Sequence, residues 1–189
     1  MIDVNFKKDN LMLTASQANE PIPNELEWIS GFLSFRQELT GEDIESVRNF
    51  SLLWNLFEGL VCNKHASVAA LENAVSDMQE RHKLRTEDYD KFLKYFTNRY
   101  IENGEITRRF GRLNLRKGDR RELVEGVLKG DETAPEKVLL AILIIVYRYR
   151  NNLFHGEKSI YDLPNQIDNF RNANQLLMVF MEKWKGTKS

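Results

Sequence analysis

The sequence predicts an all-α fold in which a bundle of helices surrounds one buried central helix. Apolar residues recur at steps of three and four along most of the chain, and the 189 residues include only four Pro and ten Gly. No segment shows the alternation typical of a half-buried strand. The length suits one domain, and it is enough to bury a sizeable core. We expect an irregular N-terminal segment over residues 1–23 and a single helical domain over residues 24–187.

The first half of the chain predicts four helices, each with an apolar side. Asn24 can cap a helix over about 24–38, whose buried side would hold Leu26, Trp28, Ile29, Phe32 and Leu33. A strongly amphipathic helix over 42–63 would bury Val47, Phe50, Leu53, Trp54, Phe57, Leu60 and Val61. A third, over 67–81, carries Val68, Leu71, Val75 and Met78. Thr86 would cap a fourth that ends at Asn103-Gly104 and turns inward Tyr89, Phe92, Leu93, Phe96 and Tyr100.

The second half predicts the central helix and the last one. Short helices fit around 106–113 and 120–129. Pro135 suits the first turn of a helix over about 136–154, and the apolar run over 138–147 makes this the most buried element. Gly156 would end it. A last helix over 165–185 would bury Ile167, Phe170, Leu176, Leu177, Phe180 and Trp184.

Charge and cysteine usage limit the class of protein. The 27 Lys and Arg nearly balance the 28 Asp and Glu, which excludes a chain that is basic all over but not a local basic patch. Residues 105–121 hold seven basic and two acidic residues, whereas residues 1–47 hold three basic and nine acidic ones. The single cysteine, Cys62, excludes an internal disulfide and a cysteine-based zinc site. We expect a cytoplasmic protein without a membrane span, metal or cofactor, since the N-terminus lacks an apolar signal core and the longest apolar run is about half a span.

The most informative stretch is 147–158, where the apolar helix ends in a cluster of two Arg, two Asn and one His. Such a cluster beside a buried run is costly unless its members are exposed, paired or functional. Each helical residue advances about 100°, so Asn151 and His155 share a face, whereas Arg150 and His155 lie roughly 140° apart. A compact Arg/His site would therefore need a second element or a second subunit.

These residues resemble the R-x(4–6)-H motif of the HEPN superfamily, the higher eukaryotes and prokaryotes nucleotide-binding domains. The motif is read in Arg150-Asn151-Asn152-Leu153-Phe154-His155 at the end of a long buried helix, and Gly156 follows it. The wider stretch over 147–158 is similar to the Apea-like branch, as is Leu53-Trp54-x-x-Phe57-Glu58 on an earlier helix. The resemblance covers mainly residues 42–180.

The resemblance implies a HEPN-like helical bundle that dimerises, so that two motifs form one composite site. Many members are metal-independent endoribonucleases of toxin–antitoxin, abortive-infection and anti-phage systems. On this basis Arg150, Asn151 and His155 would be catalytic, and RNA cleavage would leave a 2′,3′-cyclic phosphate. RNA, a second copy of the chain, and an antitoxin or nucleotidyltransferase would be the partners. The alternative is a non-catalytic HEPN module that binds RNA or nucleotide or mediates dimerisation. A third hypothesis is a helical interaction protein in which the motif is coincidental.

Several further residues have both a functional and a structural interpretation. Glu58 could fix the orientation of Arg150 or Arg148, or be a partly exposed helix charge. Arg148 and Asn152 could support the site. The basic run could track an RNA backbone, with Phe110 available for stacking, or it could be a solvated face or a contact with the acidic residues 20–45. Its candidate RNA contacts are Arg108, Arg109, Arg112, Arg116 and Lys117.

Overall fold

The predicted all-α bundle is confirmed in the computed structural model of the chain. The structure describes residues 24–33, 39–154 and 160–185, except for the side chains of Ser30, Leu33, Ile160 and Tyr161. Within that part, helices account for nearly all of the regular structure, and the strands form one short hairpin. The expectation for residues 1–23 falls outside the described residues.

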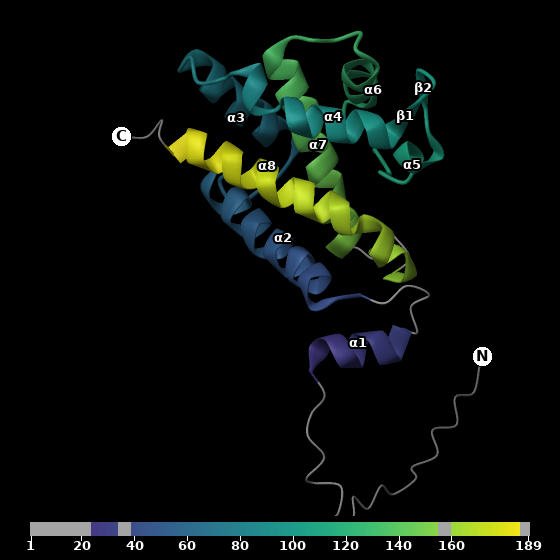
Figure 1. Ribbon diagram of the computed structural model, residues 1–189. Helices are drawn as coiled ribbons and strands as arrows, with labels where there is room; N and C mark the ends of the chain where they lie inside the picture. Colours follow the sequence, from purple (N-terminus) through teal and green to yellow (C-terminus); the bar gives the residue numbers. More distant parts are fainter. Residues whose placement is uncertain (1–23, 34–38, 155–159, 186–189) are drawn as a thin grey trace, which may run out of the picture.

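The elements follow one another in the order seen in Figure 1. The α-helices are α1 (Glu25–Leu33), α2 (Gly41–Leu60), α3 (Val68–Glu80), α4 (Asp90–Tyr100), α5 (Arg108–Gly111), α6 (Arg121–Lys129), α7 (Pro135–Phe154) and α8 (Ile167–Lys185). Two 3₁₀ segments, η1 (Thr86–Asp88) and η2 (Ile160–Gln166), precede α4 and α8. The hairpin strands are β1 (Ile101–Glu102) and β2 (Glu105–Ile106).

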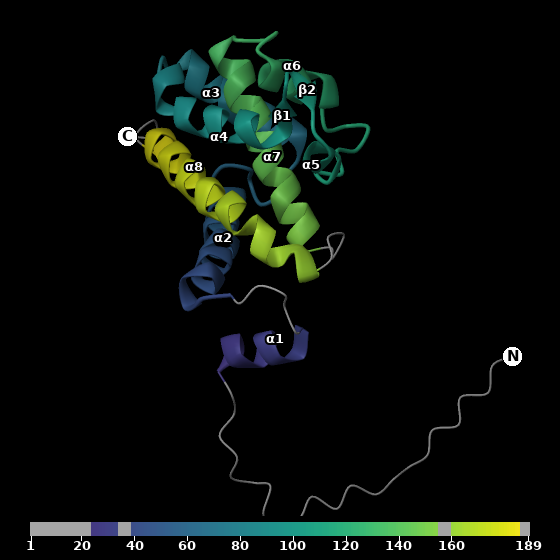
Figure 2. The ribbon, with the colours of Figure 1, turned by 45° about the vertical axis from the view of Figure 1, so that its right-hand side comes forward.

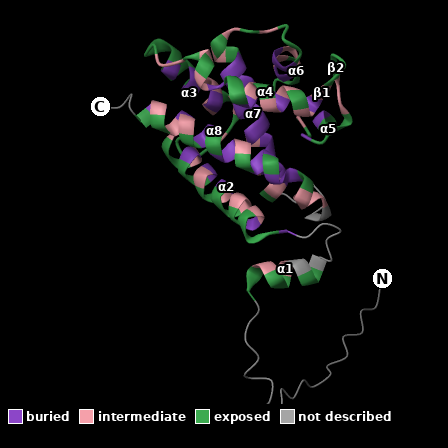
Figure 3. Cartoon of the chain, in the orientation of Figure 1, coloured by how far each residue is buried: buried purple, intermediate pink, exposed green. Residues whose placement is uncertain are grey.

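Helix α7 is the centre of the bundle, as its apolar run predicted. Every residue over 138–146 is buried, and Pro135 is the first helical residue, where its missing N–H costs nothing. Helices α3, α4, α6 and α8 pack against it. Figures 1 and 2 show α7 passing between them, and Figure 3 shows that the buried residues gather on α7 and on the sides of its neighbours. The packing of α7 in the core therefore sets the position of its polar C-terminal end.

Helices α2 and α8 run side by side in the same direction and form the second layer (Figure 1). Aromatic pairs mark their contact: the ring centroids of Phe50 and Phe170 lie 5.0 Å apart, and those of Phe57 and Phe180 lie 5.5 Å apart. Thr40 begins α2 with a capping box, in which it and Asp43 exchange side chain-to-backbone hydrogen bonds. This packing fixes the face of α2 that meets the end of α7.

Three apolar residues predicted to be buried are exposed. Trp28 is 55% exposed and Phe32 is 71% exposed, and their rings stack on each other rather than on the bundle. The half-buried Leu26 packs instead on a small cluster of Leu39, Ile44 and Ile167. On α2, Leu60 is 59% exposed and forms a row at four-residue steps with the exposed Leu52 and Leu56. These positions continue a helical period without facing a partner element among the described residues.

The predicted fourth helix differs at both ends. Thr86 opens η1 rather than capping α4, which begins only at Asp90. Helix α4 ends at Tyr100, and Asn103-Gly104 forms the turn of the β1–β2 hairpin rather than a helix end. Both turn residues have positive φ, 53° and 79°, which is the requirement of a type I′ hairpin turn and the reason for an Asn-Gly pair.

Candidate functional site

The last two turns of α7 turn their polar side chains toward different neighbours. Arg148 and Tyr149 are buried, whereas Arg150 is half-buried. Consecutive helical residues point about 100° apart, so these three side chains meet different parts of the bundle. His155 lies outside the described residues, and the geometry of the site is therefore built from Arg150 and its neighbours.

Arg150 is held in place at the protein surface. Its Nη2 lies 3.5 Å from Glu58 Oε2 on α2, and its Nη1 donates a 3.2 Å hydrogen bond to Asn151 Oδ1. The guanidinium carbon lies 5.5 Å from the ring centroid of Phe154. Its Nε is buried and has no hydrogen-bond partner among the described residues. The side chain keeps 28% of its surface exposed, so Arg150 is oriented by its neighbours and still partly accessible from solvent.

Two hydrogen bonds besides the contact with Arg150 hold the Glu58 carboxylate in place. Its Oε2 accepts a 2.9 Å hydrogen bond from Trp54 Nε1, and its Oε1 accepts a 3.1 Å hydrogen bond from the Ala66 backbone N–H. Trp54 is in the core, as predicted. Of the two arginines that Glu58 could orient, its pair is with Arg150. The Leu53-Trp54-x-x-Phe57-Glu58 segment and the R-x(4)-H segment, 92 residues apart at this pair, thus meet in space.

Arg148 does not flank the site, contrary to its expected supporting role. Only 1% of its side chain is exposed, and its Nη1 lies 3.3 Å from Asp119 Oδ2. Its Nε donates to the Leu113 carbonyl at 3.0 Å, and its Nη2 lies 3.5 Å from Asn152 Oδ1. A buried guanidinium is stable only when its charge and its N–H groups have such partners. Through these contacts Arg148 holds the segment after α5 against the central helix.

Asn152 has the same structural task, whereas Asn151 belongs with Arg150. The buried Asn152 donates from Nδ2 to the carbonyls of Arg112 and Leu113, at 3.2 Å in each case. Asn151 is 5% exposed and accepts from Arg150. The expected support from Asn152 is thus indirect, through the position of residues 112–113.

The basic run divides into two groups. Arg108, Arg109 and Arg112 line a cavity of about 480 Å³, whereas Arg116 and Lys117 are exposed elsewhere on the segment before α6. Three arginines of the run have acidic partners outside residues 20–45: Arg112 pairs with Asp162, Arg120 with Glu72, and Arg121 with Glu125. Phe110 is 1% exposed and packs on Tyr100, so it is not available to stack on a base.

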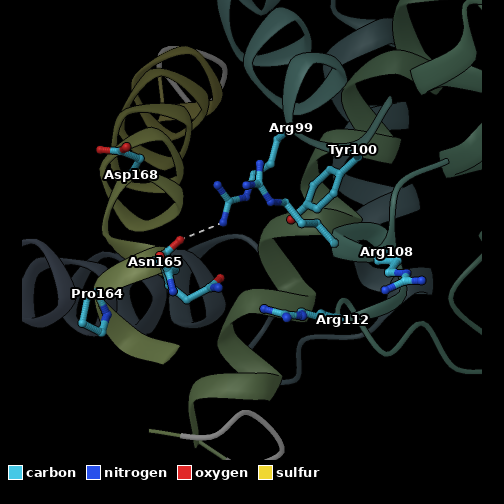
Figure 4. Close-up of a pocket in the computed structure, with 9 residues that line it drawn as sticks. Arg99, Tyr100, Arg108, Arg112, Pro164, Asn165 and Asp168 are labelled. Atoms are coloured by element: carbon cyan, nitrogen blue, oxygen red, sulfur yellow. Dashed lines mark hydrogen bonds between the residues drawn. The ribbon is translucent and has the colours of Figure 1, made fainter. Parts of the chain in front are cut away.

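The cavity, which we call the arginine cavity, lies between three elements (Figure 4). Its walls are the end of α4, the α5 turn and the η2–α8 junction, contributed by Arg99, Tyr100, Arg108, Arg109, Arg112, Pro164, Asn165, Gln166 and Asp168. Figure 4 shows Arg99 reaching from α4 toward Asn165, where its Nη2 donates to the carbonyl oxygen at 2.8 Å. Sequence analysis missed Arg99, because it stands alone on a helix and only the fold brings it beside the basic run.

Arg150, Glu58, Asn151 and Phe154 form a group that we call the Arg150 cluster. This cluster and the arginine cavity lie on different sides of the α7 terminus. Arg150 meets α2 through Glu58, whereas Asn152 meets the backbone of the cavity residue Arg112. The side chains of residues 150 and 152 point about 200° apart around the helix axis, so they lie on opposite sides of α7. Nothing in the described residues joins them into one pocket.

The described part of the chain holds no group of three or more His, Cys, Asp or Glu placed to bind a metal ion. None of the helices within residues 24–33, 39–154 and 160–185 has the length and apolarity needed to cross a membrane.

Comparisons of the chain with protein-family models, with curated proteins and with solved structures find no match. The interpretation of its function therefore depends on the residues, on the geometry of the α7 terminus and on the resemblance of the motif.

Proposed function

We propose that the protein is a metal-independent endoribonuclease of HEPN type. The observation that supports this most is the environment of Arg150, whose guanidinium is oriented by Glu58 and Asn151 while 28% of the side chain stays exposed. A cation held in this way at the end of the most buried helix suits the stabilisation of charge on phosphoryl oxygens. Arg148, by contrast, is 1% exposed and is held by Asp119, Leu113 and Asn152.

The proposed reaction moves one proton and exchanges one phosphorus–oxygen bond. The RNA 2′-OH attacks the adjacent phosphorus, the bond from phosphorus to the 5′ oxygen breaks, and the products carry a 2′,3′-cyclic phosphate and a 5′-OH. His155 would accept the 2′-OH proton as general base or donate a proton to the leaving oxygen as general acid. Arg150 would stabilise the charge on the phosphoryl oxygens, and the Asn151 Nδ2 would donate to the phosphate or orient His155.

A homodimer would complete the site. Since Arg150 and His155 are five residues apart on one helix, a single copy brings them only loosely together. Two copies that meet at their α7 ends would supply a base and an acid from different subunits. The toxin or anti-phage role and a silencing antitoxin or nucleotidyltransferase partner follow from the same resemblance. The proposed cytoplasmic location rests instead on the single cysteine, which suits a reducing compartment.

One observation favours the alternative of a non-catalytic HEPN module. The Glu58 carboxylate already neutralises part of the Arg150 charge at 3.5 Å, which weakens the attraction of this cluster for phosphate. In that case RNA or nucleotide would bind, or the module would mediate dimerisation, without cleavage.

The test is RNA cleavage in EDTA by four versions of the full chain: wild type, His155→Ala, Arg150→Ala and the matched control Arg171→Ala. Arg171 is also a partly exposed arginine in an ion pair, with Asp43 on α2. We expect each motif variant to lose about 100-fold or more in rate, with the control close to wild type. Light scattering on the same samples measures the dimer. Bound but intact RNA would favour the alternative, and motif variants as active as wild type would exclude the proposed site.

A further inference from the structure

The arginine cavity gathers more positive charge than the described residues neutralise. Four guanidinium groups line it against one carboxylate, that of Asp168. Asp168 is itself paired with Arg171, at 3.2 Å. Asp162, beside the cavity, pairs with Arg112 at 3.2 Å. Like charges that converge on one hollow repel each other, and an anionic ligand removes that cost.

Two of these arginines are held in position without a ligand. Arg99 is fixed by its 2.8 Å hydrogen bond to the Asn165 carbonyl, and Arg112 by its ion pair with Asp162. The Arg99 Nε is buried and has no hydrogen-bond partner among the described residues. An unpaired buried donor of a charged group is unusual in a folded protein, and here it belongs to a side chain that lines the cavity.

The size of the hollow exceeds that of a phosphate ion. The cavity volume of about 480 Å³ lies in the range of small-molecule sites. A second hollow of about 620 Å³, along the β1–β2 hairpin, shares Arg99, Arg108 and Arg109 with it. A ligand could therefore place its phosphate among the arginines and extend its remaining part along the hairpin.

From this geometry we infer that the arginine cavity binds the terminal phosphate of a phosphorylated nucleotide, either free or at the 5′ end of an RNA strand. Arginine suits this group because its planar fork donates two parallel hydrogen bonds to phosphate oxygens. Arg99 and Arg109 would make the principal contacts with the phosphate, and Arg112 would contact it from the side of the cavity next to η2. The inference does not rest on the proposed cleavage, since none of these residues belongs to the Arg150 cluster.

The experiment measures binding to the full chain by titration calorimetry and fluorescence anisotropy. The free ligands are 5′-AMP and adenosine, and the RNA ligands are one short oligonucleotide with a 5′-phosphate or a 5′-OH. The oligonucleotide carries 2′-O-methyl groups, so that it cannot be cleaved by 2′-OH attack. The variants are Arg99→Gln and Arg109→Gln, and the matched control is Arg81→Gln, an exposed arginine directly after α3.

We expect the phosphorylated member of at least one pair to bind more tightly. Each cavity variant should weaken that binding by about 10- to 100-fold, and Arg81→Gln should leave it unchanged. Arg109→Gln keeps the test valid if Arg99→Gln fails to fold, because Arg109 is exposed and its backbone hydrogen bond from the Arg112 N–H is kept when the side chain changes. A preference for 5′-AMP over adenosine assigns a free nucleotide, and a preference only within the oligonucleotide pair assigns an RNA end. Equal binding within both pairs, or binding that survives Arg109→Gln, would overturn the inference.

Discussion

Replacing Arg148 by methionine tests whether this arginine is structural rather than functional. Methionine keeps most of the apolar length of the side chain but removes the guanidinium. The change breaks the buried ion pair with Asp119, whose side chain is 9% exposed against 1% for Arg148. It also removes the hydrogen bond from Arg148 Nε to the Leu113 carbonyl.

The expected cost follows from what is left behind. Removing one partner of a buried ion pair typically costs about 3–5 kcal/mol of the free energy of unfolding. The lower end applies, because Asp119 still accepts a 2.8 Å hydrogen bond from the Arg116 backbone N–H and the Leu113 carbonyl still accepts from Asn152. A loss of about 3 kcal/mol corresponds to a fall in Tm of roughly 6–12 °C for a chain of this size.

The assay is urea and thermal unfolding of wild type, Arg148→Met and the control Arg171→Met. The partly exposed ion pairs of Arg171 with Asp43 and Asp168 should each contribute no more than about 1 kcal/mol. Adding Asp119→Ala to Arg148→Met should recover part of the loss, since the unpaired carboxylate is then gone. An Arg148→Met protein as stable as wild type would refute the structural assignment of Arg148.

Two further predictions follow from buried titratable groups. Burial raises the pKa of Tyr100 to about 12, although the hydrogen bond with Tyr149 acts in the opposite direction. The neutral phenol of Tyr100 therefore stabilises the folded protein fully below about pH 10, the pKa of tyrosine in the unfolded chain. This stabilisation is lost as the pH rises from about 10 to 12. The urea midpoint should therefore fall over this window, and fall less in Tyr100→Phe; an equal fall in both would contradict the assignment. Burial and the nearby Glu58 carboxylate raise the pKa of the Cys62 thiol to about 12, so iodoacetamide should label native protein near neutral pH far more slowly than urea-unfolded protein, and equal rates would contradict it.

The bundle was readable from the sequence wherever an apolar period met a partner helix. The central helix was predicted over 136–154 and is found at Pro135–Phe154, and all six residues expected to face inward on the last helix are buried. A helical period alone does not show whether a partner helix exists, so the period predicts that Trp28, Phe32 and Leu60 are buried although the structure exposes them. The Asn103-Gly104 pair carried a usable hairpin signal, but the flanking strands have only two residues each.

The candidate site was predictable in its residues but not in their assignments. Spacing placed Arg148 and Arg150 on one helix end, and only the packing shows that Arg148 turns to Asp119 while Arg150 turns to Glu58. The pairing of Glu58 with Arg150 was one of two predicted options. Arg99 gave no local signal, since it joins the basic run through the packing of α4 on α5. The role of His155 and the HEPN assignment stay predictions.

The most direct test of the account is the chemical identity of the RNA ends produced in EDTA by wild type beside Arg150→Ala. We predict 2′,3′-cyclic phosphate and 5′-OH ends from the wild type, and their loss from an Arg150→Ala protein that melts close to wild type. Intact RNA with the wild-type dimer, or the same ends at the same rate from Arg150→Ala, would contradict the claim that Arg150 stabilises the reacting phosphate.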